Sequence, residues 1–514
     1  MKISRRNALG LLAGGFSLAR AQTVKPEPPS GIEIEKGPFQ GTRKSLSEYE
    51  IPEWFSNAKF GIWAHWGPQS AVEAGDWYAR NMYMEGSPQY HYHVQTYGHP
   101  SKFGFKDTIP YWKAEKFEPD ELISLYKKAG AKYFVSMGVH HDNFDMWNSK
   151  YQRWNVTKMG PKKDVVGLWS KAARNAGLKF GVTEHLWIVY KWFSTSHGHD
   201  ENGPYAGVSY DGTNPEYFDL YVDSDEVDIK LDWDESGIPA WWKHHWYMRI
   251  RDLVDQYEPD LLYTDGALPF EDYGFNLVAH HYNLSARKNG GKTQAVYTSK
   301  RPQDTEKGVG ILDVERGVVD KIWPRPWQTD TCLGDWHYKR GIEYKTPKTV
   351  IDMLVDIVSR NGNLLLNFPL PASGQLDQEE RNVLSEITKW MGVNSEGIHD
   401  TRPWKIFGEG PGTAAPDPNS SFNENKRKDL TPADVRFTTK GDVLYAFVMG
   451  WPEYQAVVKP LATDTELRVG KIQNVSLLGY DGRVDFTQDR SGLKVLLPRQ
   501  KPCDYAVALK INGA

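Results

Sequence analysis

Cysteine is almost absent from this sequence, which has only Cys332 and Cys503 in 514 residues. Two cysteines cannot build a disulfide framework or a cysteine-rich zinc site, and the sequence does not decide whether they pair with each other. Long apolar runs are missing too, because no stretch reaches the roughly 20 residues that a membrane-spanning helix needs. We therefore expect no membrane partner.

An excess of positive charge is also lacking. The chain has 62 Lys and Arg residues against 66 Asp and Glu residues, which gives a formal net charge of −4. A nucleic-acid-binding protein needs a basic surface to face the phosphates, so we expect no nucleic-acid partner.

Three familiar catalytic motifs are missing as well. No glycine-rich phosphate loop follows a strand-like run, which argues against a doubly wound nucleotide-binding sheet. No Gly-x-Ser-x-Gly elbow is present, so a serine nucleophile has no support. The zinc-helix pattern of two histidines four residues apart around a glutamate is absent, and we expect no metal site.

Residues 1–21 have the layout of an export signal. Arg5 and Arg6 precede an apolar run over 8–18, and small residues at 19 and 21 resemble a cleavage site. The paired arginines indicate the twin-arginine route of bacteria, with an ordinary secretory signal or a basic tail as the alternatives. We expect a periplasmic or extracellular protein whose mature chain begins near Gln22.

Strand-like apolar runs alternate with helical patterns over residues 45–405. The strands are expected at 59–65, 132–139, 178–183, 260–265, 294–298, 310–314 and 363–368. Such alternation is typical of a parallel α/β fold, and we expect a (β/α)8-like TIM barrel as the catalytic domain. A loop rich in Gly, Pro, Asn and Ser follows at 409–431. The short alternating runs of 432–514 then predict an antiparallel β-sandwich.

Polar side chains gather directly after the predicted strands. They are His65, His140, His141, Glu184, His185 and Asp265. Catalytic residues of a TIM barrel lie at the carboxyl ends of its strands, so we expect these side chains to meet on one face. Two adjacent histidines point in different directions from extended backbone, which makes His140 and His141 better donors to hydroxyls or an anion than joint metal ligands.

Two carboxyl groups are the candidates for catalysis. Asp265 ends a predicted strand, where an acid suits a barrel mouth, although an Asp-Gly pair is also typical of a turn or a helix cap. Glu315 follows another predicted strand and could be a general acid if burial raises its pKa, or it could pair with Arg316. The next candidates for the acid are Glu306, Asp313 and Glu184.

Aromatic residues make up 13% of the chain, and several stand beside the polar candidates, among them Trp66, Trp77 and Trp336. Sugar rings have flat CH faces that aromatic walls can bury, while fixed polar groups bind the hydroxyls. The combination indicates a carbohydrate site. Packing of a large barrel explains many of these aromatics one by one, but explains their pairing with Asp and His less well.

Ten short segments occur in the order of one enzyme family. They are Trp54–Ile62, Ala64–Gly67, Asp76–Tyr78, His140–Phe144, Trp154–Asn155, Gly160–Asp164, Gly177–Gly181, Tyr263–Gly266, Gly362–Asn367 and Thr401–Trp404. Together they resemble the α-L-fucosidases of glycoside hydrolase family twenty-nine. The resemblance implies a barrel-like catalytic domain followed by a β-sandwich, in agreement with the pattern of elements.

The resemblance also implies roles for particular residues. Asp265 matches the nucleophile, and Glu315 resembles the acid/base by its place between Asp265 and the segment 327–338. Lys300 or Arg301 resembles the basic residue that precedes the acid/base in relatives. The expected substrate-binding residues are His65, Trp66, Asp76, Trp77, His140, His141, Tyr263 and Trp336. Retention of configuration needs two carboxyl groups about 5–5.5 Å apart and no cofactor.

The chain departs from the family pattern at four places. Tyr263 stands where relatives usually have Trp, Asp76 replaces a common Glu, and Asn143 replaces a Gly. Thr183-Glu184-His185 stands where a tyrosine-rich stretch is usual. These changes leave the exact sugar and linkage open.

We therefore expect an exported, retaining exo-α-L-fucosidase that hydrolyses terminal α-L-fucose from oligosaccharides, glycoconjugates or polysaccharides by double displacement. Its partner would be a fucosylated glycan, and the oligomeric state is not indicated. The alternatives are a related glycosidase for a sugar of fucose-like configuration such as a galactoside, a non-catalytic carbohydrate-binding protein, and a metal-dependent hydrolase built on the histidines.

Overall fold

Eight parallel strands form the sheet at the centre of the molecule, in the spatial order β6-β5-β4-β3-β2-β1-β8-β7. They are β1 (Phe60–Ala64), β2 (Tyr133–Val139), β3 (Lys179–Glu184), β4 (Leu261–Thr264), β5 (Val296–Ser299), β6 (Ile311–Leu312), β7 (Trp327–Cys332) and β8 (Gly362–Asn367). β1 pairs with β2 and β8, and a parallel bridge between Asp313 and Gln328 links the two remaining ends. The sheet is a nearly closed barrel, which confirms the (β/α)8-like fold expected from the sequence.

This computed structural model describes residues 32–514 except 225–226, 229, 307, 414–421 and 468–469. The expected export signal, residues 1–21, lies outside the described residues. In the described part of the chain, no helix combines the length and the apolar composition that a membrane span requires. Cys332 and Cys503 are free thiols and do not pair.

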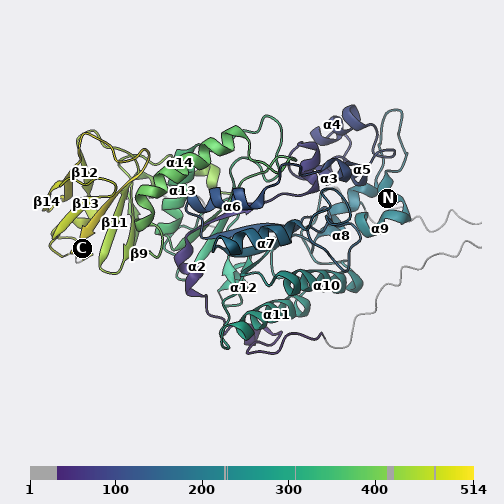
Figure 1. The fold of residues 1–514 in the computed structure, drawn as a ribbon, viewed down its shortest axis with the longest axis horizontal. Coiled ribbons are helices and arrows are strands. Elements are labelled where there is room, and N and C mark those ends of the chain that lie inside the picture. Colours follow the sequence, from purple (N-terminus) through teal and green to yellow (C-terminus); the bar gives the residue numbers. More distant parts are fainter. Residues whose placement is uncertain (1–31, 225–226, 229, 307, 414–421, 468–469) are drawn as a thin grey trace, which may run out of the picture.

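Helices connect the strands and cover the outside of the barrel (Figure 1). They are α6 (Pro119–Lys128), α7 (Val165–Asn175), α10 (Ala240–Tyr257), α11 (Asp272–Lys288), the short α12 (Pro302–Thr305), α13 (Pro347–Ser359) and α14 (Gln378–Asn394). Local sequence sets their starts: Asp164 caps α7 by accepting a hydrogen bond from the Gly167 amide at 2.9 Å, and prolines begin α6 and α13. Among the described residues no helix lies between β6 and β7. An irregular loop, 313–326, joins these strands and carries Glu315.

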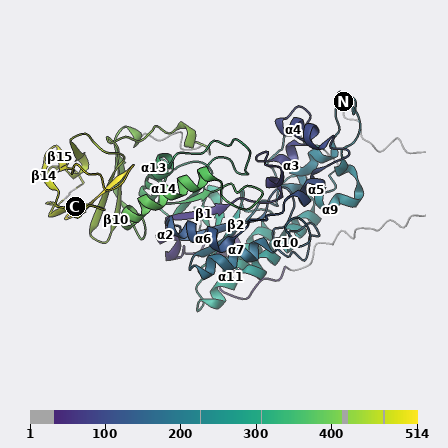
Figure 2. The ribbon, with the colours of Figure 1, turned by 45° about the horizontal axis from the view of Figure 1, so that its top comes forward.

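Short helices inserted after β1 and β3 lie together at the end of the molecule opposite the C-terminus (Figures 1 and 2). They are α3 (Tyr78–Asn81), α4 (Pro88–Tyr97), α5 (Phe105–Thr108), α8 (Val189–Trp192) and α9 (Phe218–Tyr221). The two insertions contact each other, since the Tyr83 hydroxyl donates to the Tyr221 hydroxyl at 3.0 Å and the Phe105 ring packs on Phe193. They place Asp76, Trp77 and Trp233 around the barrel mouth. Two small helices precede the barrel, α1 (Arg43–Leu46) and α2 (Glu53–Ala58).

Two antiparallel sheets form the C-terminal domain, as expected from the alternating runs. The larger sheet has the order β13-β16-β11-β10-β9 and the smaller β12-β15-β14. Their strands are β9 (Arg402–Glu409), β10 (Val435–Lys440), β11 (Val443–Val448), β12 (Gln455–Val458), β13 (Asn474–Leu477), β14 (Asp485–Asp489), β15 (Gly492–Leu496) and β16 (Val507–Asn512).

The C-terminal sheet begins before the loop at which the sequence suggested a boundary. β9 pairs with β10, and Trp404 of β9 packs its ring 5.0 Å from that of Phe437. The expected ranges 45–405 and 432–514 therefore divide this sheet, because a strand can pair across a long loop that sequence periodicity does not bridge. The barrel and the sandwich share a contact in which Trp390 of α14 donates to the Ala506 carbonyl at 2.7 Å.

Candidate active site

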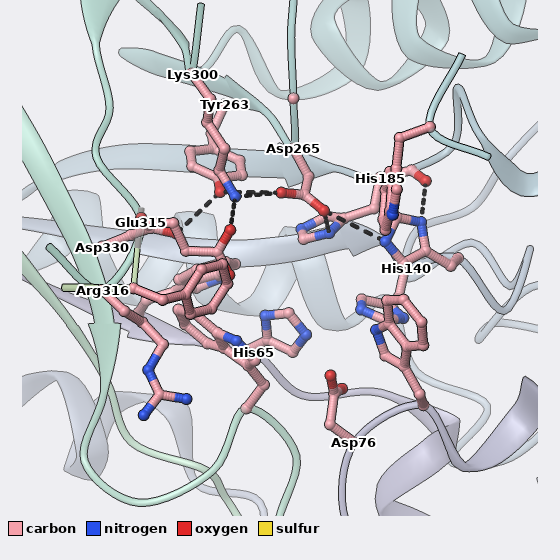
Figure 3. A pocket seen from close by; sticks show the side chains of 17 residues that line it. His65, Asp76, His140, His185, Tyr263, Asp265, Lys300, Glu315, Arg316 and Asp330 are labelled. Atoms are coloured by element: carbon pink, nitrogen blue, oxygen red, sulfur yellow. Dashed lines mark hydrogen bonds and ion pairs between the residues drawn. The ribbon is translucent and has the colours of Figure 1, made fainter. Parts of the chain in front are cut away.

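A pocket of about 450 Å³ opens at the carboxyl ends of the barrel strands (Figure 3). Its walls come from the ends of β1 to β7 and from the inserted loops. The lining residues are Trp63, His65, Asp76, Trp77, His140, His141, His185, Trp233, Tyr263, Asp265, Gly266, Lys300, Glu315, Arg316, Asp330, Trp336 and Phe422. The position at the strand ends is the one that TIM barrels use for catalysis.

One ammonium group joins the two candidate catalytic carboxyl groups. Lys300 Nζ, just after β5, contacts Asp265 Oδ1 after β4 and Glu315 Oε2 after β6 (Figure 3). A shared donor limits the separation of these two oxygens to at most twice a hydrogen-bond length, about 6 Å. Two carboxyl groups about 5–5.5 Å apart are the arrangement of retaining glycosidases.

Asp265 has further partners on the side away from Lys300. Its Oδ2 lies 3.1 Å from His185 Nδ1 and 3.3 Å from His141 Nε2. Burial raises the pKa of Asp265, but the charge of Lys300 and the contacts with the two histidines outweigh burial and hold this pKa well below its ordinary value. Asp265 is therefore an ionised carboxylate, as a nucleophile must be.

Glu315 is surrounded differently. Burial raises the pKa of Glu315 to about 7, and the nearby carboxylates of Asp330 and Asp265 act in the same direction against the opposing charge of Lys300. A carboxyl group with such a pKa can donate a proton near neutral pH. The pocket thus holds a protonatable acid, Glu315, and an ionised carboxylate, Asp265, both in contact with Lys300 Nζ.

Histidine rings form the floor between Asp265 and the inserted loops. His65 is 3% exposed, and neither of its ring nitrogens has a hydrogen-bond partner among the residues that the structure describes. His140 Nδ1 lies 2.7 Å from Gln69 Nε2, and His337 Nδ1 lies 2.5 Å from Asp76 Oδ1. Burial holds the pKa values of His65 and His140 well below the ordinary histidine value, so both rings are neutral. Neutral imidazoles can both donate to and accept from sugar hydroxyls.

The same rings include groups with the spacing of metal ligands. His65, Asp76, His140 and His337 offer ligand atoms within 4.8 Å of one another, and so do His140, His141 and His185. All of these residues except His337 line the pocket. The chemistry of neutral imidazole suits either use, so the metal-dependent alternative has to be separated by experiment.

The pocket brings together every residue predicted as nucleophile, acid/base or substrate-binding residue except Trp66. Trp66 is buried outside the barrel interior, where its ring packs on Trp112 and Phe117 and its Nε1 donates to the Pro371 carbonyl at 3.0 Å. The expectation that Trp66 binds substrate is therefore wrong. Successive side chains of an extended segment alternate in direction, so His65 faces the pocket and Trp66 faces away.

Three candidates for the acid besides Glu315 do not line the pocket. Glu184 is buried and accepts hydrogen bonds from Trp246 Nε1 at 3.0 Å and the Leu186 amide at 2.9 Å. Asp313 is buried and accepts from Gln328 Nε2 at 2.8 Å. Glu306 lies at a separate surface hollow.

Sequence reasoning missed part of the site. His185 was noticed without a role, and Lys300 was one of two choices for a basic residue. Asp330 and Phe422 had no signal, because Asp330 lies in the middle of β7 and Phe422 in a loop far along the chain. Asp330 accepts from the Tyr263 hydroxyl at 2.9 Å, which gives the tyrosine that replaces the usual tryptophan a polar partner below the pocket.

The architecture is that of a glycoside hydrolase. At the mouth of a parallel barrel, two carboxyl groups share one ammonium group, and imidazole and indole rings form the walls. The family model described as "Alpha-L-fucosidase" matches residues 29–396, and the model "Alpha-L-fucosidase C-terminal domain" matches residues 427–512. The chain therefore belongs to the α-L-fucosidase family, which confirms the resemblance seen in the sequence.

Relatives and solved structures agree with this assignment. The chain is 28% identical over 492 residues to the tissue α-L-fucosidase of Bos taurus, covering 91% of this chain and 90% of the relative. It is 27% identical to the human tissue enzyme, with 91% of each chain covered. The fold is similar to that of Thermotoga maritima α-fucosidase in complex with fucose, with a TM-score of 0.69, 24% identity and coverage of 92% of this chain and 99% of that chain.

Proposed function

We propose that this α-L-fucosidase is an exo-acting, retaining enzyme in which Asp265 is the nucleophile and Glu315 the acid/base. The observation that carries the proposal is the contact of one ammonium, Lys300, with both carboxyl groups. A pocket of about 450 Å³ suits a terminal sugar. The substrate is then terminal α-L-fucose on oligosaccharides, glycoconjugates or polysaccharides.

In the first step Asp265 attacks the anomeric carbon, and an ester bond forms as the glycosidic bond breaks. Glu315 gives its proton to the departing oxygen, which leaves as a hydroxyl group. The positive charge of Lys300 stabilises the ionised nucleophile before attack. His65 and His140 bind hydroxyls of the sugar, while the rings of Trp77 and Trp336 bury its apolar faces.

In the second step Glu315 acts as a base. Formation of the ester removes the negative charge of Asp265, and that charge is one of the causes that raise the pKa of Glu315. The pKa of Glu315 therefore falls in the intermediate, so Glu315 remains a carboxylate after it has given up its proton. This carboxylate then accepts a proton from the attacking water. The resulting hydroxide attacks the anomeric carbon and releases Asp265.

The test is turnover by the purified chain of an aryl α-L-fucoside compared with an aryl β-D-galactoside. The proposal predicts preferred hydrolysis of the fucoside, because a C5 methyl group needs an apolar wall and a hydroxymethyl group a polar partner. Lack of fucoside turnover would contradict the proposal. A purely carbohydrate-binding protein would turn over neither substrate but would bind fucose.

The two histidine groups with metal-ligand spacing keep the metal-dependent alternative testable. Full fucoside hydrolysis after exhaustive chelation would dismiss a catalytic metal. Loss of hydrolysis that is restored by adding zinc back would favour that alternative over the double displacement.

We also propose that the chain is exported in a bacterial cell by the twin-arginine route. Arg5 and Arg6 before an apolar run support this proposal. Replacement of both by lysine should move the protein from the periplasmic or extracellular fraction into the cytoplasm. An unchanged distribution would contradict the proposed route.

A further inference from the structure

Two exposed aromatic rings border the catalytic pocket. Of the tryptophan and phenylalanine side chains in the described ranges, only Trp233, at 49% exposure, and Phe422, at 52%, are exposed, and both line this pocket. Large apolar side chains are usually buried, and exposed ones that border a ligand pocket indicate a contact surface. The two rings belong to different walls of the pocket.

Trp233 belongs to the wall of the nucleophile. Its ring centre lies 5.9 Å from that of Trp77 and 5.8 Å from that of His141. His141 in turn contacts Asp265. Trp233 therefore stands beside the sugar that Asp265 attacks.

Phe422 belongs to the wall of the acid/base. Its backbone N–H donates to the Glu315 carbonyl at 3.0 Å, and the Arg316 guanidinium lies 5.9 Å from its ring centre. Glu424 extends this contact, because its carboxylate accepts from Arg316 Nε at 2.6 Å and its amide donates to the Arg316 carbonyl at 2.9 Å. Residues 422–424, which lie between β9 and β10 of the C-terminal sheet, are thus bound to the loop that carries Glu315.

The backbone at this contact has an unusual conformation. Phe422 has φ of 61° and Arg316 has φ of 45°, in the left-handed region that large side chains rarely adopt. Such conformations persist where surrounding contacts hold them, and they concentrate at functional sites. Here the contacts hold the apolar ring of Phe422 exposed at the pocket mouth, although an apolar ring is more stable when it is buried.

We propose that Phe422 and Arg316 form the binding site for the leaving group, and that this leaving group is a neutral pyranose. Glu315 has to protonate the glycosidic oxygen, so the sugar on the far side of that oxygen lies against the Glu315 wall. Its CH face covers the Phe422 ring, and its hydroxyls accept hydrogen bonds from Arg316. The charge of Arg316 is compensated by Glu424, which Lys345 also contacts at 3.2 Å, so Arg316 is not a free cation that would select an acidic sugar. The inference rests on the proposed function, because it takes Glu315 as the acid.

The test compares two substrates that both need protonation of a poor leaving group. A fucosyl-galactose disaccharide reaches Phe422, whereas methyl α-L-fucoside is too small to do so. We expect Phe422→Gly to lower the ratio of kcat/KM for the disaccharide to kcat/KM for the methyl fucoside about tenfold. Glycine adopts the backbone conformation at this position readily, so the loop should keep its place.

Two further variants complete the experiment. Phe422→Tyr keeps an aromatic ring and should keep the ratio within about twofold. Tyr454→Ala removes a ring that is 78% exposed on the C-terminal domain and should leave the ratio unchanged.

Two results would overturn the inference: an unchanged kcat/KM for both substrates in Phe422→Gly, or an equal loss on both, since either result leaves the ratio unchanged. The equal loss would mean that Phe422 only holds the Glu315 loop. Failure of the wild-type chain to hydrolyse either substrate would instead contradict the proposed function itself.

Discussion

Two carboxyl groups that share one ammonium differ in their protonation because their other neighbours differ. Asp265 also contacts His185 and His141. Together with Lys300, these histidines lower the pKa of Asp265 by more than burial raises it. Glu315 has Lys300 but faces the negative charges of Asp330 and Asp265. The proposed division into nucleophile and acid thus rests on the side chains that the barrel brings to each group.

The pH dependence of hydrolysis should report the acid. Glu315 must carry a proton in the first step and its pKa is raised to about 7, so kcat/KM should fall as the pH rises above about 7. A pH–rate profile on methyl α-L-fucoside measures this limb. Glu315→Ala should lose most activity on that poor leaving group, and azide should restore part of the turnover of an aryl fucoside. An alkaline limb that survives in Glu315→Ala would assign it to another group.

Lys300 should control both carboxyl groups at once. Its charge lowers the pKa values of Asp265 and Glu315, so Lys300→Met should raise both, protonate part of the nucleophile near neutral pH and lower kcat by about 10²-fold or more. The alkaline limb should move to higher pH. Lys300→Arg keeps the charge and is the control, and an unmoved limb in Lys300→Met would contradict the account.

Asn143 shows what a single departure from a family pattern means. Its φ of 62° lies in the left-handed region, which glycine adopts freely and asparagine tolerates better than most residues. The Asn143 side chain points away from the pocket, since its Oδ1 accepts from Arg249 and its Nδ2 donates to the Leu220 carbonyl at 2.8 Å. The departure therefore does not change the sugar-binding surface, which the sequence alone could not reveal.

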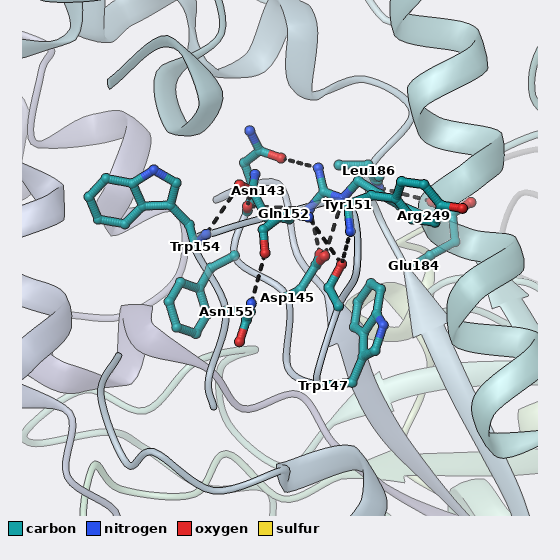
Figure 4. A network of polar contacts seen from close by, with 12 residues as sticks. Asn143, Asp145, Trp147, Tyr151, Gln152, Trp154, Asn155, Glu184, Leu186 and Arg249 are labelled. Carbon is teal, nitrogen blue, oxygen red and sulfur yellow. Dashed lines mark hydrogen bonds and ion pairs between the residues drawn. The ribbon is translucent and has the colours of Figure 1, made fainter. Parts of the chain in front are cut away.

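At the scale of elements, helix α10 braces the two loops that carry the site histidines (Figure 4). Arg249 of α10 is fully buried, and it donates to Asp145 Oδ1 and Asn143 Oδ1, each at 2.5 Å, just after β2. One turn earlier, Trp246 donates to Glu184 at the end of β3. The helix thus holds the residues that follow His140 and His141 and the residue that precedes His185.

Breaking this brace should cost stability. Arg249→Met leaves the buried Asp145 carboxylate without its partner, and we expect the free energy of unfolding to drop by about 3–5 kcal/mol. Denaturant unfolding measures the change. Arg483→Met is the control, because Arg483 faces Asp485 at the surface with 90% of its side chain exposed. This variant should unfold like the wild type. Equal stability of Arg249→Met and the wild type would contradict the bracing role.

Strand β7 shows why part of the barrel escaped prediction. Apolar strands, such as those expected at 132–139 and 363–368, could be predicted from their runs. In contrast, β7 has the sequence Trp327-Gln-Thr-Asp-Thr-Cys332, and its Gln328 and Asp330 are buried, with Asp330 lining the pocket. A strand with polar side chains in the barrel interior lacks the apolar signal on which such predictions depend.

At the scale of the whole molecule, barrel and sandwich meet at one buried carboxylate. Asp356 of α13 contacts Arg360 of the same helix, Arg427 of the connecting segment and Arg436 of β10. Burial raises the pKa of Asp356, but the three guanidinium groups reverse the effect and hold it far below its ordinary value. The carboxylate therefore binds α13 of the barrel to β10 of the sandwich and to Arg427, which lies between β9 and β10.

Removal of this charge should loosen the domain contact. Asp356→Asn leaves three buried or half-buried arginines without their common partner, and we expect unfolding to become easier by about 3–5 kcal/mol. Thermal unfolding and proteolysis between residues 410 and 434 should both report the loss. Asp485→Asn, with a side chain that is 76% exposed, is the control. Unchanged unfolding of Asp356→Asn would mean that the interface depends on its apolar contacts instead.

The barrel followed by a sandwich and the candidate pair of carboxyl groups were predicted from the sequence, but the contact of Phe422 and Glu424 with the Glu315 loop was not. Phe422 and Glu424 lie about 100 residues beyond Glu315, in a stretch whose composition indicated only a loop. Periodicity reports local structure, so a loop that folds back on a distant site leaves no periodic signal.

The most direct test of the account is to trap the glycosyl-enzyme ester. The purified chain would be incubated with a fucosyl fluoride that carries fluorine at C2, which slows hydrolysis of the ester, then digested and mapped by mass spectrometry. The account predicts one fluorofucosyl group on the peptide that contains Asp265. A label on Glu315, or turnover without a label and with inversion at the anomeric carbon, would contradict it.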